Sequence, residues 1–136
     1  MKQLTKVLLT GMLVIFITSC VDQKADSEDI KLVTADEMKT IIEREDVQLI
    51  DVRTPSEFES VHIKSAQNID FRSPTFDADI QKLDKSKPVL LYCKSGGRSA
   101  KCAKKLKDAG FEKVYDLDGG ISKWEYAELL TADEKS

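Results

Sequence analysis

The residues best suited to chemistry form one short segment, Cys93-Lys94-Ser95-Gly96-Gly97-Arg98-Ser99. It follows the apolar run 89–92, the clearest buried strand in the sequence, so Cys93 is expected at the carboxyl end of a strand. The two glycines allow the loop to curl so that consecutive backbone N–H groups point inward. The helix expected to begin near Ser99 adds its positive end, and Lys94 and Arg98 add full charges. We therefore predict that Cys93 is a nucleophilic thiolate with a pKa below that of a free cysteine, and that it needs no histidine base.

The alternative interpretation of this segment is a buried, inert cysteine followed by glycines that only turn the chain. Inert cysteines are seldom placed beside a Gly-Gly loop that is flanked by cations. The pattern therefore favours a reactive thiol at Cys93.

Composition excludes several other kinds of site. The chain has 136 residues, enough for one domain, and its 21 basic and 24 acidic side chains give a net charge of −3. Because no basic surplus exists to neutralise phosphates, nucleic acid is not an expected partner. The single histidine, His62, excludes sites that need two imidazoles, and three unevenly spaced cysteines form no disulfide framework. We expect no metal, so the chemistry must come from thiols, carboxylates, cations or backbone groups.

Around the cysteine segment the expected elements alternate between strand and helix. Short apolar runs predict strands over residues 30–33, 47–52, 66–69, 89–92 and 113–117. Helices are expected after a Thr34–Glu37 capping box, at 55–58, weakly at 76–83, from the loop to Ala109, and after Gly119-Gly120 with Ile121 and Trp124. This alternation predicts a single α/β domain with a mostly parallel central sheet and helices on both faces. Ligands of such sheets bind where strands end and helices begin, which is where Cys93 is expected.

The amino-terminal residues read as a secretory signal peptide over 1–19. Lys2 and Lys6 precede the uncharged run 7–17, which at eleven residues is too short to span a bilayer as a helix. The exit Ile17-Thr18-Ser19-Cys20 resembles a bacterial lipobox, which implies cleavage before Cys20 and lipidation of its sulfur. The expected protein is thus anchored by lipid to a bacterial cell envelope and faces the periplasm or exterior. A plain signal peptide with an incidental cysteine, or a retained amino-terminal anchor, are the alternatives.

The remaining chain divides into three parts. Residues 20–30 are polar and acidic without periodicity, and we interpret them as a flexible tether that begins at the lipidated cysteine. The folded domain is expected over 31–130, and residues 131–136 are expected to be a disordered tail.

The cysteine segment resembles the active-site loop of the rhodanese (sulfurtransferase) family, whose pattern is Cys-x-x-Gly-x-Arg-Ser/Thr. Two flanking signatures resemble the same family. The first contains Asp51-Val52-Arg53 with Glu57, Phe58, His62, Ile63, Ala66, Asn68 and Ile69. The second is the run from Val114 to Ile121 together with Trp124. The first signature departs from the family at Val61, Lys64 and Ser65, where glycine, or proline then glycine, is usual; this concerns local turn geometry.

The resemblance implies a sulfurtransferase that works through a covalent persulfide on Cys93, with no other cofactor. A small anionic donor of thiosulfate type would supply the sulfur, and a thiol or cyanide would accept it. The residues implied to bind the donor and persulfide are Lys94, Ser95, Gly96, Gly97, Arg98 and Ser99. Only four residues separate Cys93 from Arg98, whereas related phosphatases have five, so the smaller ring favours a sulfur atom over a phosphoryl group. A monomer is expected.

Other residues have expected supporting roles. Asp51 ends its strand near the loop and is expected to orient it, Arg53 and Glu57 to pair across a turn, and His62 to be structural. Cys102 lies in an apolar stretch of the following helix, so we expect a protonated, inert thiol. The alternative is a resolving role, in which Cys102 forms a disulfide with Cys93 under oxidation. The competing functional class is a non-catalytic rhodanese-like module that binds a partner or senses redox state.

Overall fold

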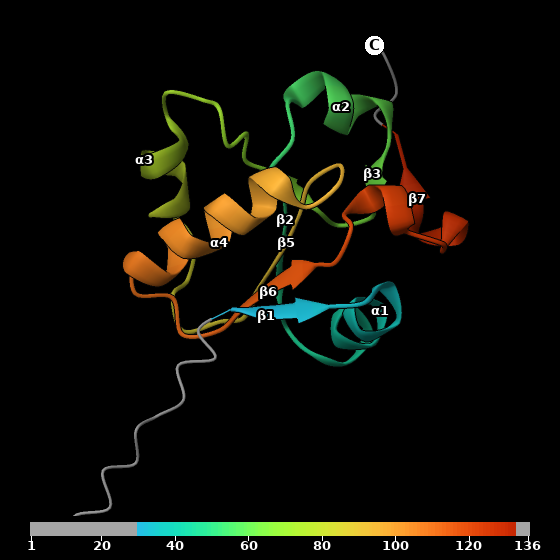
Figure 1. The fold of residues 1–136 in the computed structure, drawn as a ribbon, viewed down its shortest axis with the longest axis horizontal. Helices are drawn as coiled ribbons and strands as arrows, with labels where there is room; N and C mark the ends of the chain where they lie inside the picture. The colour runs from blue at the N-terminus through green and yellow to red at the C-terminus, as the bar shows by residue number, and fades with distance from the viewer. Residues whose placement is uncertain (1–29, 133–136) are drawn as a thin grey trace, which may run out of the picture.

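Five parallel strands form the central sheet of the computed structural model, which describes residues 30–132 (Figure 1). All neighbouring strands pair in parallel, so their carboxyl ends meet at one edge of the sheet. In spatial order they are β1 (Lys31–Val33), β6 (Val114–Leu117), β5 (Val89–Tyr92), β2 (Gln48–Asp51) and β4 (Gln67–Asn68). The α/β class and the parallel sheet are confirmed. Cys20 and the predicted signal peptide lie outside the described residues.

Helices cover both faces of the sheet, as predicted. Side chains of a strand alternate between the faces, so β5 sends Leu91 to one core and Leu90 to the other. The first core contains buried residues of α3 (Phe76–Ile80) and α4 (Gly97–Asp108), and the second contains Met38 of α1 (Ala35–Arg44). Figure 1 shows α3 and α4 on the opposite side of the sheet from α1.

Local signals fix where the helices begin. Thr34 caps α1 and exchanges hydrogen bonds with Glu37, as the sequence predicts. Thr54 and Glu57 form a second capping box at α2 (Pro55–Ser60), whose first residue is proline. Helix α4 begins at Gly97 rather than near Ser99, because Gly96 has a φ of +109° and turns the chain directly from the loop into the helix.

The carboxy-terminal part differs from the expectation of a last α-helix. Two short 3₁₀ turns, η1 (Ile121–Lys123) and η2 (Ala127–Leu129), replace it. The first amides of η1 donate to the cysteine loop, as the unpaired N–H groups at the start of a helical turn can. Strand β7 (Leu130–Thr131) then pairs with β3 (His62–Ile63), so order extends one residue beyond the predicted domain end. Within residues 30–132, no helix has the length and apolar character needed to cross a bilayer.

Candidate active site

The sulfur of Cys93 lies at the end of β5 and faces the start of α4. The residue is only 1 % exposed, and burial alone raises a thiol's pKa. Two hydrogen bonds to Sγ have the opposite effect and lower this pKa. The backbone N–H of Gly96 donates at 3.1 Å and the hydroxyl of Ser99 at 3.5 Å. Burial is the largest single influence, but the Ser99 hydroxyl and the backbone N–H groups of Ser95, Gly96 and Ser99 together lower the pKa of Cys93 below its ordinary value. The surroundings of Cys93 therefore favour its thiolate form.

The loop amides gather around the sulfur because the chain reverses at Gly96. Its left-handed φ of +109° is one that side chains rarely adopt, and it serves as the N-cap of α4. The free N–H groups of the first helical turn, with the positive end of the helix dipole, are therefore directed at the loop interior. The predicted amide cradle is present at Ser95, Gly96 and Ser99. The Ser99 hydroxyl is a further donor to the sulfur, whereas the sequence predicted only the backbone amide of this residue.

The turn after β6 holds the outer side of this loop. The N–H of Ile121 donates to the Cys93 carbonyl at 2.9 Å, and Ser122 donates to the Lys94 carbonyl from its N–H at 3.0 Å and its hydroxyl at 2.6 Å. A Cβ on Gly120 would lie 2.5 Å from the Lys94 carbonyl oxygen and 2.6 Å from that of Cys93. Gly120, with a φ of +64°, therefore permits a close approach that points the loop carbonyls away from the sulfur. The adjacent glycines, Gly119 and Gly120, predict a turn at this position, but the sequence does not show that the turn contacts the cysteine loop.

A cleft of about 470 Å³ opens above the sulfur. Its walls come from the loop, from the first turns of α4 and from the segment after β4. Three of its cations, Arg72, Lys94 and Lys101, are exposed, and none forms an ion pair with another residue in 30–132. Lys94 is among the donor-binding residues expected from the sequence, whereas Arg72 and Lys101 are not. The complete lining is Phe71, Arg72, Cys93, Lys94, Ser95, Gly97, Arg98 and Lys101.

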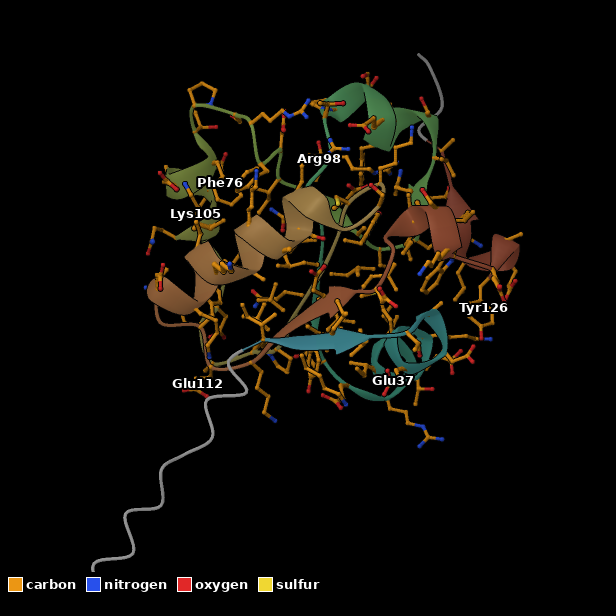
Figure 2. All side chains as sticks on the ribbon, in the orientation of Figure 1. Glu37, Phe76, Arg98, Lys105, Glu112 and Tyr126 are labelled. Atoms are coloured by element: carbon orange, nitrogen blue, oxygen red, sulfur yellow. The ribbon has the colours of Figure 1, made fainter. Side chains whose placement is uncertain are left out.

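Arg98 has an ion-pair partner that the sequence did not predict. Its guanidinium donates twice to Glu57, from Nη1 at 2.7 Å to Oε2 and from Nη2 at 2.9 Å to Oε1. Figure 2 shows Arg98 at the end of α4 nearest α2, far along the helix from Lys105. The Arg98 guanidinium and the Thr54 cap hold the pKa of Glu57 well below its usual range. Arg98 therefore connects the start of α4 to α2, its charge is balanced by Glu57, and it also lines the cleft.

The expected Arg53–Glu57 pair is wrong, because Arg53 instead pairs with Asp51. Arg53 donates to the buried Asp51 carboxylate at 2.6 Å from Nη2 and at 3.0 Å from Nε, and it also donates to the Val61 carbonyl at 2.6 Å. Asp51 therefore organises the β2–α2 connection, and no hydrogen bond from its side chain reaches the cysteine loop among the described residues. His62 is buried with its ring stacked on Phe58 at 3.7 Å, a packing position within the fold.

The second thiol of the described chain, Cys102, lies in the middle of α4 and is also 1 % exposed. Burial is the main cause that raises its pKa to about 12, and the nearby Asp116 acts in the same direction. Cys93 and Cys102 are both free thiols. Residues 30–132 contain no group of three or more His, Cys, Asp and Glu side chains able to hold a metal ion.

The domain is similar to known proteins in sequence and in fold. A model of the "Rhodanese-like domain" matches residues 34–127. "Uncharacterized protein YqhL" of Bacillus subtilis is 41% identical over 93 residues, which are 64% of this chain and 72% of that protein. "Thiosulfate sulfurtransferase GlpE" of Tolumonas auensis is 36% identical over 86 residues, 63% of this chain and 79% of that protein. Among solved structures, a rhodanese-like domain protein from Staphylococcus aureus matches with a TM-score of 0.67 and 30% identity, over 76% of this chain and 99% of that one.

Proposed function

This chain belongs to the rhodanese-like domain family, and from that premise we propose that it is a sulfurtransferase that takes a sulfane sulfur from an anionic donor of thiosulfate type. The observation that carries the proposal is the environment of Cys93. Its sulfur lies under an open cleft and accepts hydrogen bonds from Gly96 and Ser99, which lower its pKa. A thiolate in such a position is a ready nucleophile.

The proposed first step is attack by the Cys93 thiolate on the outer sulfur of thiosulfate. A new S–S bond forms at Cys93, the S–S bond of the donor breaks, and its electron pair leaves with sulfite. The amides of Ser95, Gly96 and Ser99 would stabilise the negative charge on the persulfide, because they are already oriented toward the sulfur. No proton is needed in this step.

The proposed second step returns the enzyme to its starting state. A thiolate or cyanide acceptor attacks the terminal sulfur of the persulfide, forms a bond to it, and releases the Cys93 thiolate. The same donors that lower the pKa of Cys93 make it a better leaving group here. The small ring of four residues between Cys93 and Arg98 leaves room for a sulfur atom and supports sulfur transfer over phosphoryl transfer.

The free cations of the cleft support an anionic donor. Arg98 is neutralised by Glu57, so attraction of a dianion falls to Arg72, Lys94 and Lys101, which are exposed at the rim. We expect Arg72→Ala and Lys101→Ala to raise the KM for thiosulfate several-fold with little change in kcat. Lys104→Ala, an exposed lysine of the same helix outside the cleft, is the matched control and should leave KM unchanged.

The decisive experiment combines a turnover assay with mass spectrometry. The full chain is incubated with thiosulfate, and the Cys93 peptide should gain the mass of one sulfur atom while sulfite is released. Addition of cyanide should then yield thiocyanate and remove the added mass. A chain that neither acquires the sulfur nor forms thiocyanate would instead be a non-catalytic module that binds a partner or senses redox state.

We also propose that the enzyme acts from a lipid anchor on Cys20 in a bacterial envelope. The lipobox-like exit of the apolar run supports this, although Cys20 lies outside the described residues. Cys20→Ala should abolish lipidation and leave the precursor uncleaved by the lipoprotein peptidase. Detergent partitioning and mass spectrometry of the amino terminus would test it, and an unlipidated mature wild-type chain would contradict it.

A further inference from the structure

One buried carboxyl has no place in the reaction described so far. Asp116 lies on β6, is 3 % exposed, and its Oδ1 has no hydrogen-bond partner within residues 30–132. A buried, incompletely paired carboxyl destabilises a fold, so its presence calls for a function.

The register of the sheet places Asp116 beneath the reactive cysteine. Asp116 pairs with Leu91 of β5, and Cys93 lies two residues further along that strand. Since residues two apart share a face, Asp116, Leu91 and Cys93 are all on the side of the sheet that α4 covers. From α4, the Ser99 hydroxyl lies 3.5 Å from Cys93 Sγ, and Ser99 lowers the pKa of the Asp116 carboxyl.

The Ser99 hydroxyl therefore has one proton to donate and two acidic groups, Cys93 and Asp116, that can accept it. The hydroxyl lies 3.5 Å from Cys93 Sγ and 3.3 Å from the Gly96 carbonyl, and it also interacts with Asp116. An ionised Asp116 draws the hydroxyl proton toward itself and away from the thiolate. A protonated Asp116 can donate to Ser99 Oγ, which leaves the Ser99 proton free for the sulfur.

We propose that Asp116 is a positioning residue that controls the ionisation of Cys93 through the hydroxyl of Ser99. The carboxylate and the thiolate compete for one hydrogen bond and repel each other, so loss of a proton from either raises the proton affinity of the other. The inference deepens the proposed function, because the thiolate is the attacking species. It concerns ionisation alone, so it can be tested without turnover.

The other groups around Asp116 do not replace Ser99 in this role. Its neighbour in β1 is the apolar Leu32, and Cys102 of α4 is a protonated thiol. Asp118, beyond the end of β6, adds repulsion. Burial, with that repulsion, raises the pKa of Asp116 to about 6 against the lowering effect of Ser99, so the carboxyl changes charge in a range where the protein can be studied.

The test is the rate of Cys93 alkylation by iodoacetamide between pH 4.5 and 9. Peptide mapping of the full chain reports Cys93 separately from the other thiols. The wild type should show two inflections, the lower one near pH 6. Asp116→Asn should show one inflection at a lower pH than the upper wild-type one, with labelling at pH 6 about threefold faster, equivalent to a pKa decrease of about half a unit. Asp108→Asn, which removes the same charge at an exposed position of α4, should keep the wild-type profile.

Two further measurements keep the outcome decisive. In a Ser99→Ala background, Asp116→Asn should lose most of its effect on labelling, because the connecting hydroxyl is absent. The wild-type profile provides a result that needs no variant. A single wild-type inflection, or an Asp116→Asn profile that matches Asp108→Asn, would overturn the proposal. Neither result depends on sulfur transfer, so loss of thiosulfate turnover would count against the proposed function only.

Discussion

Two thiols of this protein are equally buried and chemically opposite. Cys93 and Cys102 are each 1 % exposed. The pKa of Cys93 nevertheless lies below its ordinary value, whereas burial raises that of Cys102 to about 12. Solvent exposure alone therefore does not decide which thiol is reactive.

The difference comes from the backbone around each sulfur. Cys102 lies in the middle of α4, where N–H groups are consumed by the helix itself and none is left for a side chain. Cys93 lies where a strand has ended and a helix is starting, so that N–H groups of the loop and first turn are still unpaired. Cys102 also lies near Asp116, which disfavours a second negative charge. A buried thiol becomes reactive when unpaired donors point at it.

Replacing each thiol in turn should give the largest contrast. Cys93→Ser should abolish persulfide formation and thiocyanate production, because serine cannot hold a sulfane sulfur under these conditions. Cys102→Ser should retain nearly all activity, since Cys102 is not among the residues that line the cleft. Iodoacetamide should label Cys93 first, and prior thiosulfate should alter that labelling. First reaction at Cys102, or a Cys93–Cys102 disulfide after peroxide, would contradict the assignment of an inert thiol.

Displacing the loop should reduce the reactivity of Cys93 while leaving Cys102 unchanged. Gly120→Ala places a Cβ 2.5 Å from a backbone oxygen of the loop, so the loop must move. We expect a loss of at least about 3 kcal/mol in unfolding free energy, together with slower Cys93 alkylation in the folded protein.

Gly110→Ala is the control for that change. Gly110 also has a positive φ, +93°, but an added Cβ would meet nothing within 4 Å. It should cost only about 1 kcal/mol and leave alkylation unaltered. Chemical denaturation gives the first quantity and peptide-resolved labelling the second. Equal effects of the two substitutions would show that the Gly120 contact does not shape the loop.

Removing one hydrogen-bond donor should reduce the difference in pKa between Cys93 and Cys102. Ser99→Ala deletes the hydroxyl 3.5 Å from Cys93 Sγ and should raise the pKa of Cys93. Loss of a hydrogen bond to a charged group corresponds to roughly a tenfold decrease in alkylation rate at neutral pH. Ser95→Ala keeps its amide and removes only an exposed hydroxyl, so it should match the wild type. A Ser99→Ala rate equal to that of Ser95→Ala would remove Ser99 from the set of effective donors.

The smallest expected effect is on stability, from two ion pairs that connect the start and the middle of α4 to other helices. Glu57→Gln breaks the paired contact with Arg98 near the loop and should lower the unfolding free energy by about 1–2 kcal/mol. Asp77→Asn breaks the exposed contact with Lys105 and should cost less than about 0.5 kcal/mol.

The contribution of Glu57 also has a defined pH dependence. The folded pKa of Glu57 is lowered, so its stabilisation is complete above the unfolded value near 4.5 and is lost as pH falls below it. The difference in unfolding free energy between wild type and Glu57→Gln should therefore shrink between about pH 5 and pH 3. A difference that does not change over this range would show that the pair contributes little.

Much of the site was predictable because its parts are neighbours in the chain. The strand 89–92, the adjacent glycines and the following helix determine the Cys93 loop within about a dozen residues. The Thr34 capping box and the Pro55 helix start follow from equally local patterns. The low exposure and high pKa of Cys102 follow from apolar residues at helical spacing around it.

The misassigned residues are those whose partners are distant in the chain. Arg53 was expected to pair with Glu57, because helix-like spacing brings them close, but Arg53 turns back to Asp51. Glu57 is then available to Arg98, 41 positions away in the sequence. The contact of the last segment with the loop is equally distant, since the amides of Ile121 and Ser122 bind loop carbonyls about 28 residues earlier.

The sequence by itself predicted Cys93 as the nucleophile and determined the strand and helix that flank its loop and the α/β class, because these depend on residue types and on periodicity over a few neighbours. Tertiary structure alone decided which cations remain free in the cleft, which carboxylate binds Arg98, and that Asp116 lies beneath Cys93. The physical reason is that ion pairs and buried contacts follow the spatial order of strands, β1-β6-β5-β2-β4, and local patterning does not encode that order.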